Sequence, residues 1–263
     1  MFPHDASERR YSGGCVRRTL GFTLLELLIV VGIIAVLLVL IAPGFTSLKS
    51  AGDVTGAAYT IKGALDTART YAKANNTYAW VGFFEENISS GAPGTAGIGR
   101  VVMSIVASKD GTMLYTGNLT TNVLLDQPVP CPLIQVGKLV KIDNMHLKGF
   151  TAPTATPPPD NFNTRPPFTS AAAQIGDGGY PPNPALSFRY PVGGASPQYT
   201  FTKPIQFSPR GEMVITNNTY AFSRISEIGV EPTHGAVVPA STPANVVAIQ
   251  FNGFAGAVTI YRR

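Results

Sequence analysis

A continuous apolar run dominates the first part of the chain. The 21 residues from Phe22 to Ala42 contain one charged residue, Glu26. A helix of this length is about 31 Å long, which is the thickness of the hydrocarbon core of a bilayer. The run therefore predicts a membrane-spanning helix. Arginines precede it at Arg9, Arg10, Arg17 and Arg18. Because basic flanks stay in the cytoplasm, we expect residues 43–263 to be exported.

The pattern becomes amphipathic after Pro43. Apolar residues recur at helical spacing at Ile61, Leu65, Ala68 and Ala72. Charged residues at Lys62, Asp66, Arg69 and Lys73 fall on the other side of the same helix. This spacing predicts an amphipathic helix over about 45–74 that buries one stripe and ends near Asn75 and Asn76.

The rest of the chain has the alternation and composition of β-strands. β-branched and aromatic residues predict strands over 77–85, 99–108 and 133–142. Tyr199–Thr216 predicts two strands about a turn at Ser208–Gly211. A closing hairpin follows, in which we expect Asn252 and Gly253 to adopt positive φ.

Between these strands the composition changes. Thr151–Thr200 contains 11 of the 22 prolines, so we expect a long surface loop without regular elements. The predicted fold class is therefore α+β. A long N-terminal helix, with a transmembrane half and an amphipathic half, would pack on a C-terminal antiparallel β-sheet module over about 77–263.

Composition excludes one broad class of protein and does not favour a second. The 263 residues are 44% hydrophobic and only 13% charged, which excludes a disordered chain. The net charge of +5 is small and dispersed, whereas a nucleic-acid binder usually shows a clustered basic patch. Residues 1–21 hold four bases against two acids, so +2 of that excess lies before the apolar run.

Glu26 has an unusual place in the apolar run. An ionised side chain costs about 2.5–3.5 kcal/mol at the centre of a membrane helix, and less near its end. The simplest explanation for a charge in this run is a glutamate that lies at the membrane–water interface or is protonated there. The alternative is a functional carboxylate, and the wider motif favours it.

The stretch Arg17–Pro43 resembles the class III signal of type IV pilins and type II secretion pseudopilins. A basic leader ends in Gly21, Phe22 follows, Glu26 is the fifth residue after the glycine and Pro43 the twenty-second. The resemblance implies that a prepilin peptidase cleaves after Gly21 and methylates the new amine of Phe22. Residues 1–21 would then be a cytoplasmic leader, 22–42 the transmembrane and filament-core helix, and 43–263 a periplasmic or extracellular pilin-like domain.

The same resemblance gives Glu26 a role in assembly. Cleavage creates an ammonium at Phe22, one helical turn from Glu26 and within reach of a neighbouring subunit. A carboxylate buried without a partner is costly, so this amine would fix the register of the filament. The family often has a glycine at the fourteenth mature position, where this chain has Ala35. Melting of the helix over Gly32–Gly44 stays open, although Pro43 can break the helix.

The order of elements is similar to that of minor pseudopilins of the H type. The C-terminal pattern also resembles pilin-like Verru_Chthon cassette protein D, in placement only. An ordinary cleavable signal fits less well, because its apolar region has roughly 7–15 residues. A twin-arginine signal and a plain single-pass anchor are further alternatives.

Residues for catalysis or metal binding are scarce. Cys15 lies in the leader, so Cys131 would be the one thiol of the mature chain, and we expect it to be buried and unpaired. The histidines are His4, His146 and His234, and the chain contains no HExxH, CxxC or GxSxG motif. Five carboxylates spread over residues 151–263 do not suggest a calcium loop. We predict no enzyme activity, no metal and no cofactor.

The sequence thus predicts a minor structural subunit of a type IV pilus or a type II secretion pseudopilus. Its expected partners are a prepilin peptidase, other pilin or pseudopilin subunits and an inner-membrane assembly platform. Its expected location is the bacterial inner membrane, as a single-pass protein with a cytoplasmic N-terminus, and then the filament. The alternative is a minor pilin that binds DNA for uptake through Arg262 and Arg263, because phosphate contacts need exposed bases.

Overall fold

The computed structural model describes residues 23–112, 123–126, 131–153, 162–168, 173–176, 186–215 and 224–263. Within these ranges, only the backbone is described for residues 39–51, 123, 124 and 186. The chain divides into two compact units, Met1–Thr46 and Ser47–Arg263. We describe each unit by itself. The predicted leader and the predicted cleavage residues Gly21 and Phe22 lie outside the described residues.

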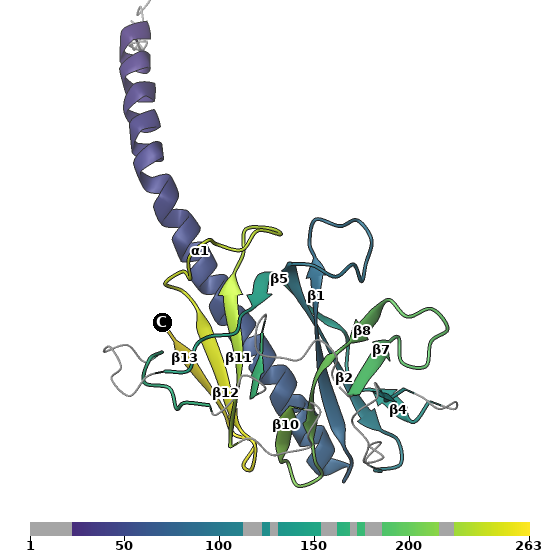
Figure 1. The fold of residues 1–263 in the computed structure, drawn as a ribbon. Helices are drawn as coiled ribbons and strands as arrows, with labels where there is room; N and C mark the ends of the chain where they lie inside the picture. Colours follow the sequence, from purple (N-terminus) through teal and green to yellow (C-terminus); the bar gives the residue numbers. More distant parts are fainter. Residues whose placement is uncertain are drawn as a thin grey trace, which may run out of the picture. The chain divides into compact units, whose positions relative to one another are not determined.

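Strands make up most of the elements in the described residues (Figure 1). The helix α1 spans Leu24–Ala74. The strands are β1 (Ala79–Asn87), β2 (Gly99–Ser108), β3 (Val123–Leu124), β4 (Leu133–Gln135), β5 (Val140–Leu147), β6 (Gln174–Ile175), β7 (Leu186–Tyr190), β8 (Tyr199–Phe201), β9 (Lys203–Phe207), β10 (Met213–Ile215), β11 (Ile225–Pro232), β12 (Val247–Asn252) and β13 (Val258–Arg262).

Ten of these strands form one sheet with the order β10-β9-β1-β2-β5-β11-β12-β13, in which β4 also pairs with β2 and β6 pairs with β11. The pairs along this path are antiparallel, and only β6 joins its neighbour in parallel. A smaller sheet has the order β3-β7-β8.

Strand β5 joins the two halves of the large sheet. Its residues Val140–Asp143 and Met145 pair with β2, and Met145–Leu147 pair with β11. Between them Asn144 adopts a left-handed φ of 58° beside a register shift in the pairing with β2. Asparagine tolerates this conformation better than most residues, so it suits the irregular position in the strand.

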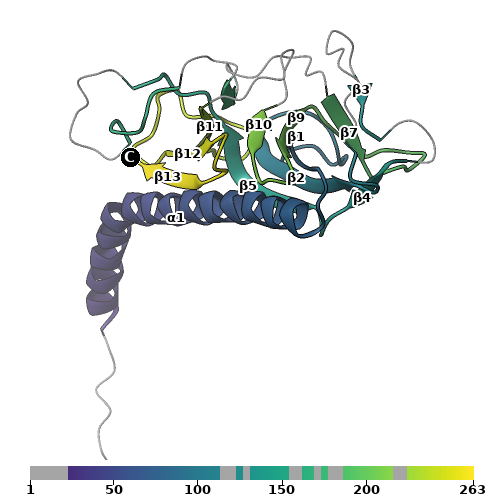
Figure 2. The same ribbon diagram turned by 90° about the horizontal axis from the view of Figure 1, so that it is seen from below.

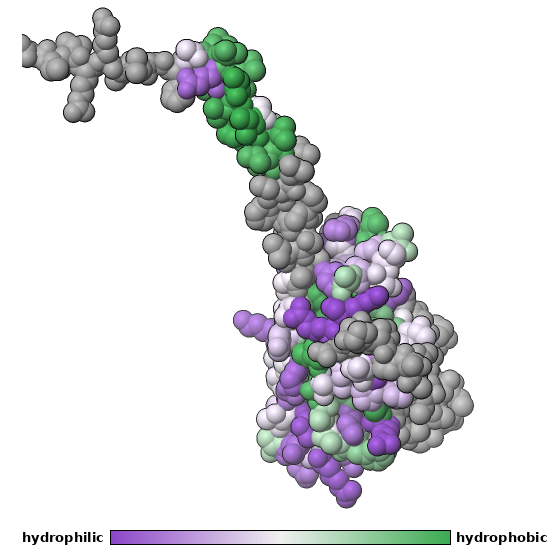
Figure 3. Space-filling view, turned by 90° about the vertical axis from the view of Figure 1, so that its left-hand side faces the viewer, coloured by the Kyte–Doolittle hydropathy of each residue, from purple (hydrophilic) through white to green (hydrophobic). Residues whose placement is uncertain are grey.

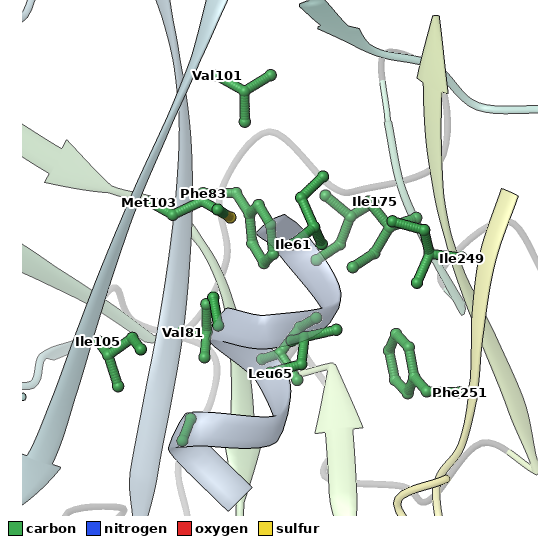
Figure 4. Close-up of a cluster of buried hydrophobic side chains, with 14 of the residues drawn as sticks. Ile61, Leu65, Val81, Phe83, Val101, Met103, Ile105, Ile175, Ile249 and Phe251 are labelled. Carbon is green, nitrogen blue, oxygen red and sulfur yellow. The ribbon is translucent and has the colours of Figure 1, made fainter. Parts of the chain in front are cut away.

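The main hydrophobic core of the second unit lies between the sheet and α1. Ile61 and Leu65 of α1 are fully buried in one cluster with Val81, Phe83 and Phe251 (Figure 4). The predicted stripe of Ile61, Leu65, Ala68 and Ala72 is buried throughout, with no exposed fraction. Each large side chain contributes about 1.5–3 kcal/mol when it leaves water.

The face of the sheet away from this core is also covered (Figure 2). Trp80 and Val102, which alternate with the core residues of β1 and β2, pack with Phe188 of β7 and Phe201 of β8. Farther along, Phe150 and Phe162 pack with Val246 and Ala248 in a third cluster. Because both faces are buried, the strands have few outward polar positions.

The predicted α+β class is wrong. The described residues form mainly a large antiparallel β-sheet of ten strands, so this sheet, and not a long N-terminal helix with a smaller β module, dominates the fold. The transmembrane half that was predicted for the helix is corrected in the next paragraph.

The predicted membrane helix is not found either. Among the described residues no helix is long and apolar enough to cross a membrane. The predicted single-pass location in the inner membrane is therefore wrong.

Three local predictions also need correction. The helix α1 continues through Pro43, so the predicted break of the helix at this residue is not observed. The predicted strand 133–142 is divided into β4 and β5, because Gly137 turns the chain with a φ of 76°. In the closing hairpin the positive φ belongs to Gly256, not to Asn252 or Gly253.

The predicted loop 151–200 is more ordered than expected. It contains β6, β7 and the first residues of β8. Arg165, Gln174, Ile175 and Phe188 are all buried. Ile175 packs in the main core and Phe188 in the cluster on the other face of the sheet, so this segment is not a simple surface loop.

Candidate assembly site

The site predicted around Glu26 lies in the first turn of α1. The Glu26 backbone N–H donates to Thr23 Oγ1 at 3.2 Å, and the Leu27 N–H donates to the Thr23 carbonyl at 3.1 Å. Thr23 thus caps the helix, because threonine oxygens satisfy backbone donors that the first turn leaves open. A carboxylate in the first turn also interacts favourably with the helix dipole. The local sequence therefore favours a helix that begins at this point.

Apolar side chains surround this carboxylate. The residues with large exposed apolar side chains are Leu24, Leu25, Leu27, Leu28, Ile29, Val30, Val31, Ile33, Ile34, Val36, Leu37 and Leu38, with exposed fractions from 44% to 81%. They gather into one hydrophobic surface on the described part of the first unit (Figure 3). Because they occupy nearly every position, the helix is apolar on all sides. Such helices are normally buried.

Large exposed apolar patches mark interaction sites in soluble proteins. Covering the surface would bury the carboxylate of Glu26 as well. A buried carboxylate needs a cationic partner, or its desolvation opposes the association. The site therefore combines an exposed apolar surface with a single carboxylate.

The other residues predicted for this site are not brought to it by the described structure. Gly21 and Phe22 lie outside the described residues, and their predicted cleavage and N-methylation stay predictions. The side chain of Pro43 is likewise outside the description.

The two terminal arginines belong to a different place in the fold. Arg262 ends β13, where it pairs with Val247 of β12, and the Arg263 N–H donates to the Val246 carbonyl at 3.2 Å. Both residues are exposed. Strand β13 is an edge of the large sheet. Two bases at its end offer only two positive charges to a phosphate backbone. DNA binding through them stays a prediction.

The remaining titratable candidates take part in packing. Cys131 is half-buried, and its thiol donates weakly to the Leu133 carbonyl at 3.8 Å. His146 Nδ1 lies 3.1 Å from Glu85 Oε2. Within the described ranges no group of three or more histidine, cysteine, aspartate and glutamate side chains is placed to hold a metal ion.

Sequence analysis missed a charged network around Glu86, whose residue is only 2% exposed. Its Oε2 accepts from Arg100 Nη1 at 2.9 Å and from Lys141 Nζ at 3.4 Å. Its Oε1 accepts from the Gly94 N–H and the Tyr199 hydroxyl, both at 2.8 Å. Burial raises the pKa of Glu86, but these donors and cations outweigh it and lower the pKa to about 2.

The same contacts change the pKa values of two partners of Glu86, Lys141 and Tyr199. The pKa of Lys141 is raised, because Tyr199 and Glu86 stabilise its ammonium more than burial opposes it. Burial is also the main reason that the pKa of Tyr199 is raised. The network therefore stays charged at neutral pH and connects β1, β2, β5 and β8.

A second missed cluster is centred on Glu227 of β11, which has no exposed surface. Arg165 Nε donates to Glu227 Oε2 at 2.8 Å, and the rest of its guanidinium donates to the carbonyls of Phe162 and Thr151. Gln174 and Gln250 donate to the same carboxylate at 3.2 and 2.8 Å. A lone Arg in a proline-rich segment gave no sequence signal for this role.

No family model, no curated protein and no solved structure matches this chain.

Proposed function

We propose that this chain is a minor structural subunit of a pilin-type filament, a type IV pilus or a type II secretion pseudopilus. A prepilin peptidase cleaves it after Gly21 and methylates Phe22. The processed chain assembles through the apolar start of α1, and Glu26 supplies the charge that sets the register with neighbouring subunits.

One observation carries this proposal. An apolar helix surface, exposed at twelve large side chains between Leu24 and Leu38, surrounds the single carboxylate of Glu26. Association with other copies would remove that surface from water. At about 25 cal/mol per Å², even partial burial of such side chains contributes several kcal/mol. The basic leader and Gly21 directly before this helix support the proposed processing.

Processing is the first test. The full chain is expressed with and without a prepilin peptidase, and the intact mass and N-terminal peptide are measured. We expect loss of residues 1–21 and the addition of one methyl group at Phe22. An intact precursor in the presence of an active peptidase would refute the proposal.

Two variants separate cleavage from assembly. Gly21→Leu should block cleavage, because the proposed scissile bond follows this residue. Glu26→Gln should leave cleavage unchanged and reduce cross-linked oligomers of the processed chain, since it removes only the charge. Lys138→Gln, which changes an exposed base in the turn between β4 and β5, is the control and should leave both readouts unchanged.

A further inference from the structure

A groove lies on the exposed side of α1 near its C-terminal end. One hollow of about 480 Å³ is lined mainly by Thr67, Thr70, Tyr71 and Ala74. A second hollow of about 360 Å³ shares Thr70 and Ala74 and adds Arg69 and Lys73. We call the surface of α1 that lines these two shallow hollows the α1 groove. It has an apolar part beside Tyr71 and a basic part beside Lys73.

The basic part of the α1 groove is not neutralised by the described structure. Arg69 donates to the carbonyl oxygens of Gly211 and Ala255, which carry no net charge. Lys73 is exposed, and its ammonium has no hydrogen-bond or ion-pair partner in the described part of the chain. The one carboxylate that lines the groove, Asp66, is paired with Lys62 at 3.0 Å. The groove therefore offers two cations to an incoming anion.

The small side chains of the α1 groove suit a helix as the guest. Thr67, Thr70 and Ala74 recur at intervals of three and four residues, so they form one row on the helix surface. Small side chains in such a row let two helices approach closely, at the short end of the usual 8–10 Å. From Asp66 to Ala74 the groove is about 12 Å long, which is about two turns of a guest helix.

This chain contains a segment with the complementary chemistry. Leu24–Leu38 is helical, exposed and apolar, and Glu26 is its only charged residue. Placing this segment in the groove would cover Tyr71 with apolar side chains and bring Glu26 to Lys73 and Arg69. A pair of opposite charges of this kind gives specificity as well as affinity.

We propose that the α1 groove binds the Thr23–Leu38 segment of a second copy, with Glu26 of one copy paired to Lys73 and Arg69 of the next. The two surfaces differ, so the contact is heterologous and each added copy leaves a free groove or a free helix. Such contacts generate open filaments. Glu26 has two carboxylate oxygens, so this contact is compatible with an ammonium at Phe22. The inference rests on the proposed filament subunit and names the surface that receives its helix.

Cysteine cross-linking tests the contact in the full chain. Cys15 and Cys131 are replaced by serine, and two differently tagged copies are expressed together with a prepilin peptidase. One copy carries Leu27→Cys and the other Thr70→Cys, so that Glu26 and Lys73 are both retained. We expect a mixed disulfide between the two copies, since a disulfide requires Cα atoms within about 7 Å.

Thr60→Cys is the positional control. Thr60 is exposed on α1 like Thr70 but lies outside the α1 groove, so it should give little mixed disulfide. Equal yields at positions 60 and 70 would overturn the proposal. A product formed only between two Leu27→Cys chains would also overturn it, because it would show symmetric pairing of the apolar helices.

Charge reversal tests the pairing. Lys73→Glu should lower the yield of the mixed disulfide about tenfold, and Glu26→Lys in the other copy should restore it. Lys138→Glu reverses an exposed base elsewhere and should leave the yield unchanged. An unchanged yield with Lys73→Glu would overturn the charge pairing.

The mass of the same samples separates the two proposals. Cleaved chains without the mixed disulfide would overturn the groove contact and leave the processing supported. Uncleaved chains that still form the mixed disulfide would support the contact and overturn the proposed processing.

Discussion

The carboxylate of Glu86 shows how one residue connects several strands. Four donors from β2, β5, β8 and the loop before β2 meet its two oxygens. Arg100 also reaches Asp143, and Lys141 donates to the Tyr199 hydroxyl at 2.5 Å. Buried polar groups stabilise a fold only when they are satisfied, and this carboxylate is. Through Tyr199 this network adds a polar link to the apolar packing that holds the small sheet to the large one.

We predict that Glu86→Gln removes pH-dependent stability. The pKa of Glu86 is lowered from 4.5 to about 2, so its contribution is complete above about 4.5 and is lost as the pH falls through about 2. One pKa unit corresponds to about 1.4 kcal/mol, and water around Arg100 and Lys141 weakens the pairs, so we expect a loss of about 2 kcal/mol at pH 7. Urea unfolding of both chains from pH 7 to pH 2 measures it.

Asp143→Asn is the matched control for this network. Asp143 also pairs with Arg100, but its side chain is 55% exposed. Exposed pairs contribute at most about 1 kcal/mol, so this variant should lose much less stability. A constant difference between wild type and Glu86→Gln over the whole pH range would contradict the assigned pKa.

At the scale of single elements, β11 shows how closely a neighbouring segment can approach a strand. Here the covering segment is Lys148–Phe150, which directly follows β5. Strand β11 is buried along nearly its whole length. The Lys148 N–H donates to the Gly229 carbonyl at 2.9 Å, which brings that backbone against the strand. A Cβ at Gly229 would lie 1.9 Å from the Lys148 carbonyl oxygen and 2.7 Å from the Phe150 ring. Glycine is required here by space.

We predict that Gly229→Ala and Gly63→Ala change stability in opposite directions. At Gly229 the methyl group meets backbone, which cannot move aside cheaply, so the free energy of unfolding should fall by about 2–3 kcal/mol. At Gly63, on α1, a Cβ meets nothing within 4 Å. Alanine there should raise the free energy of unfolding by up to about 1 kcal/mol, because it is a better helix former than glycine. Thermal unfolding followed by circular dichroism compares them. A stability gain in Gly229→Ala would show that the covering segment is loosely held.

Elements with a strong local pattern were predictable from the sequence. The predicted strand 99–108 is β2 with the same bounds, and the stripe through Ile61 and Leu65 is buried as its spacing predicts. The predicted turn at Ser208–Gly211 lies between β9 and β10, although the first of the two predicted strands is divided into β8 and β9. In each case the pattern lies within ten or so consecutive residues, which is the range over which periodicity is informative.

Elements that depend on distant partners were not predictable. Arg165 is 62 residues from Glu227, and nothing near it in sequence shows that its guanidinium is buried. β6 is two residues long and exists because β11 lies beside it. The apolar surface around Glu26 was predictable because its residues are consecutive in the sequence. The α1 groove was not, because its hollows depend on how the side chains of α1 are arranged in space.

At the scale of the whole molecule, the two compact units have different chemistry. Ser47–Arg263 contains the sheet and its three buried clusters. The described part of Met1–Thr46 is an exposed apolar helix with no core of its own. A domain that contains its own core can fold alone, whereas a helix apolar on all sides needs an external partner.

We therefore predict that a chain beginning at Ser47 keeps its fold and loses self-association. Its core residues on α1 begin at Val54, so the clusters stay complete. We expect its unfolding midpoint to stay within about 2 °C of the longer chain, since less than about 0.5 kcal/mol should change. Analytical ultracentrifugation should show monomers of this chain, and oligomers of a chain beginning at Phe22.

A chain beginning at Thr70 is the comparison that tests the boundary. It lacks Val54, Ile61 and Leu65, which are at most 1% exposed in the core. Each lost side chain removes about 1.5–3 kcal/mol, which together approach the whole stability of a typical domain. This chain should fail to fold. Oligomers of the chain beginning at Ser47 would show that association does not depend on the apolar helix, because that chain has no residue of Leu24–Leu38.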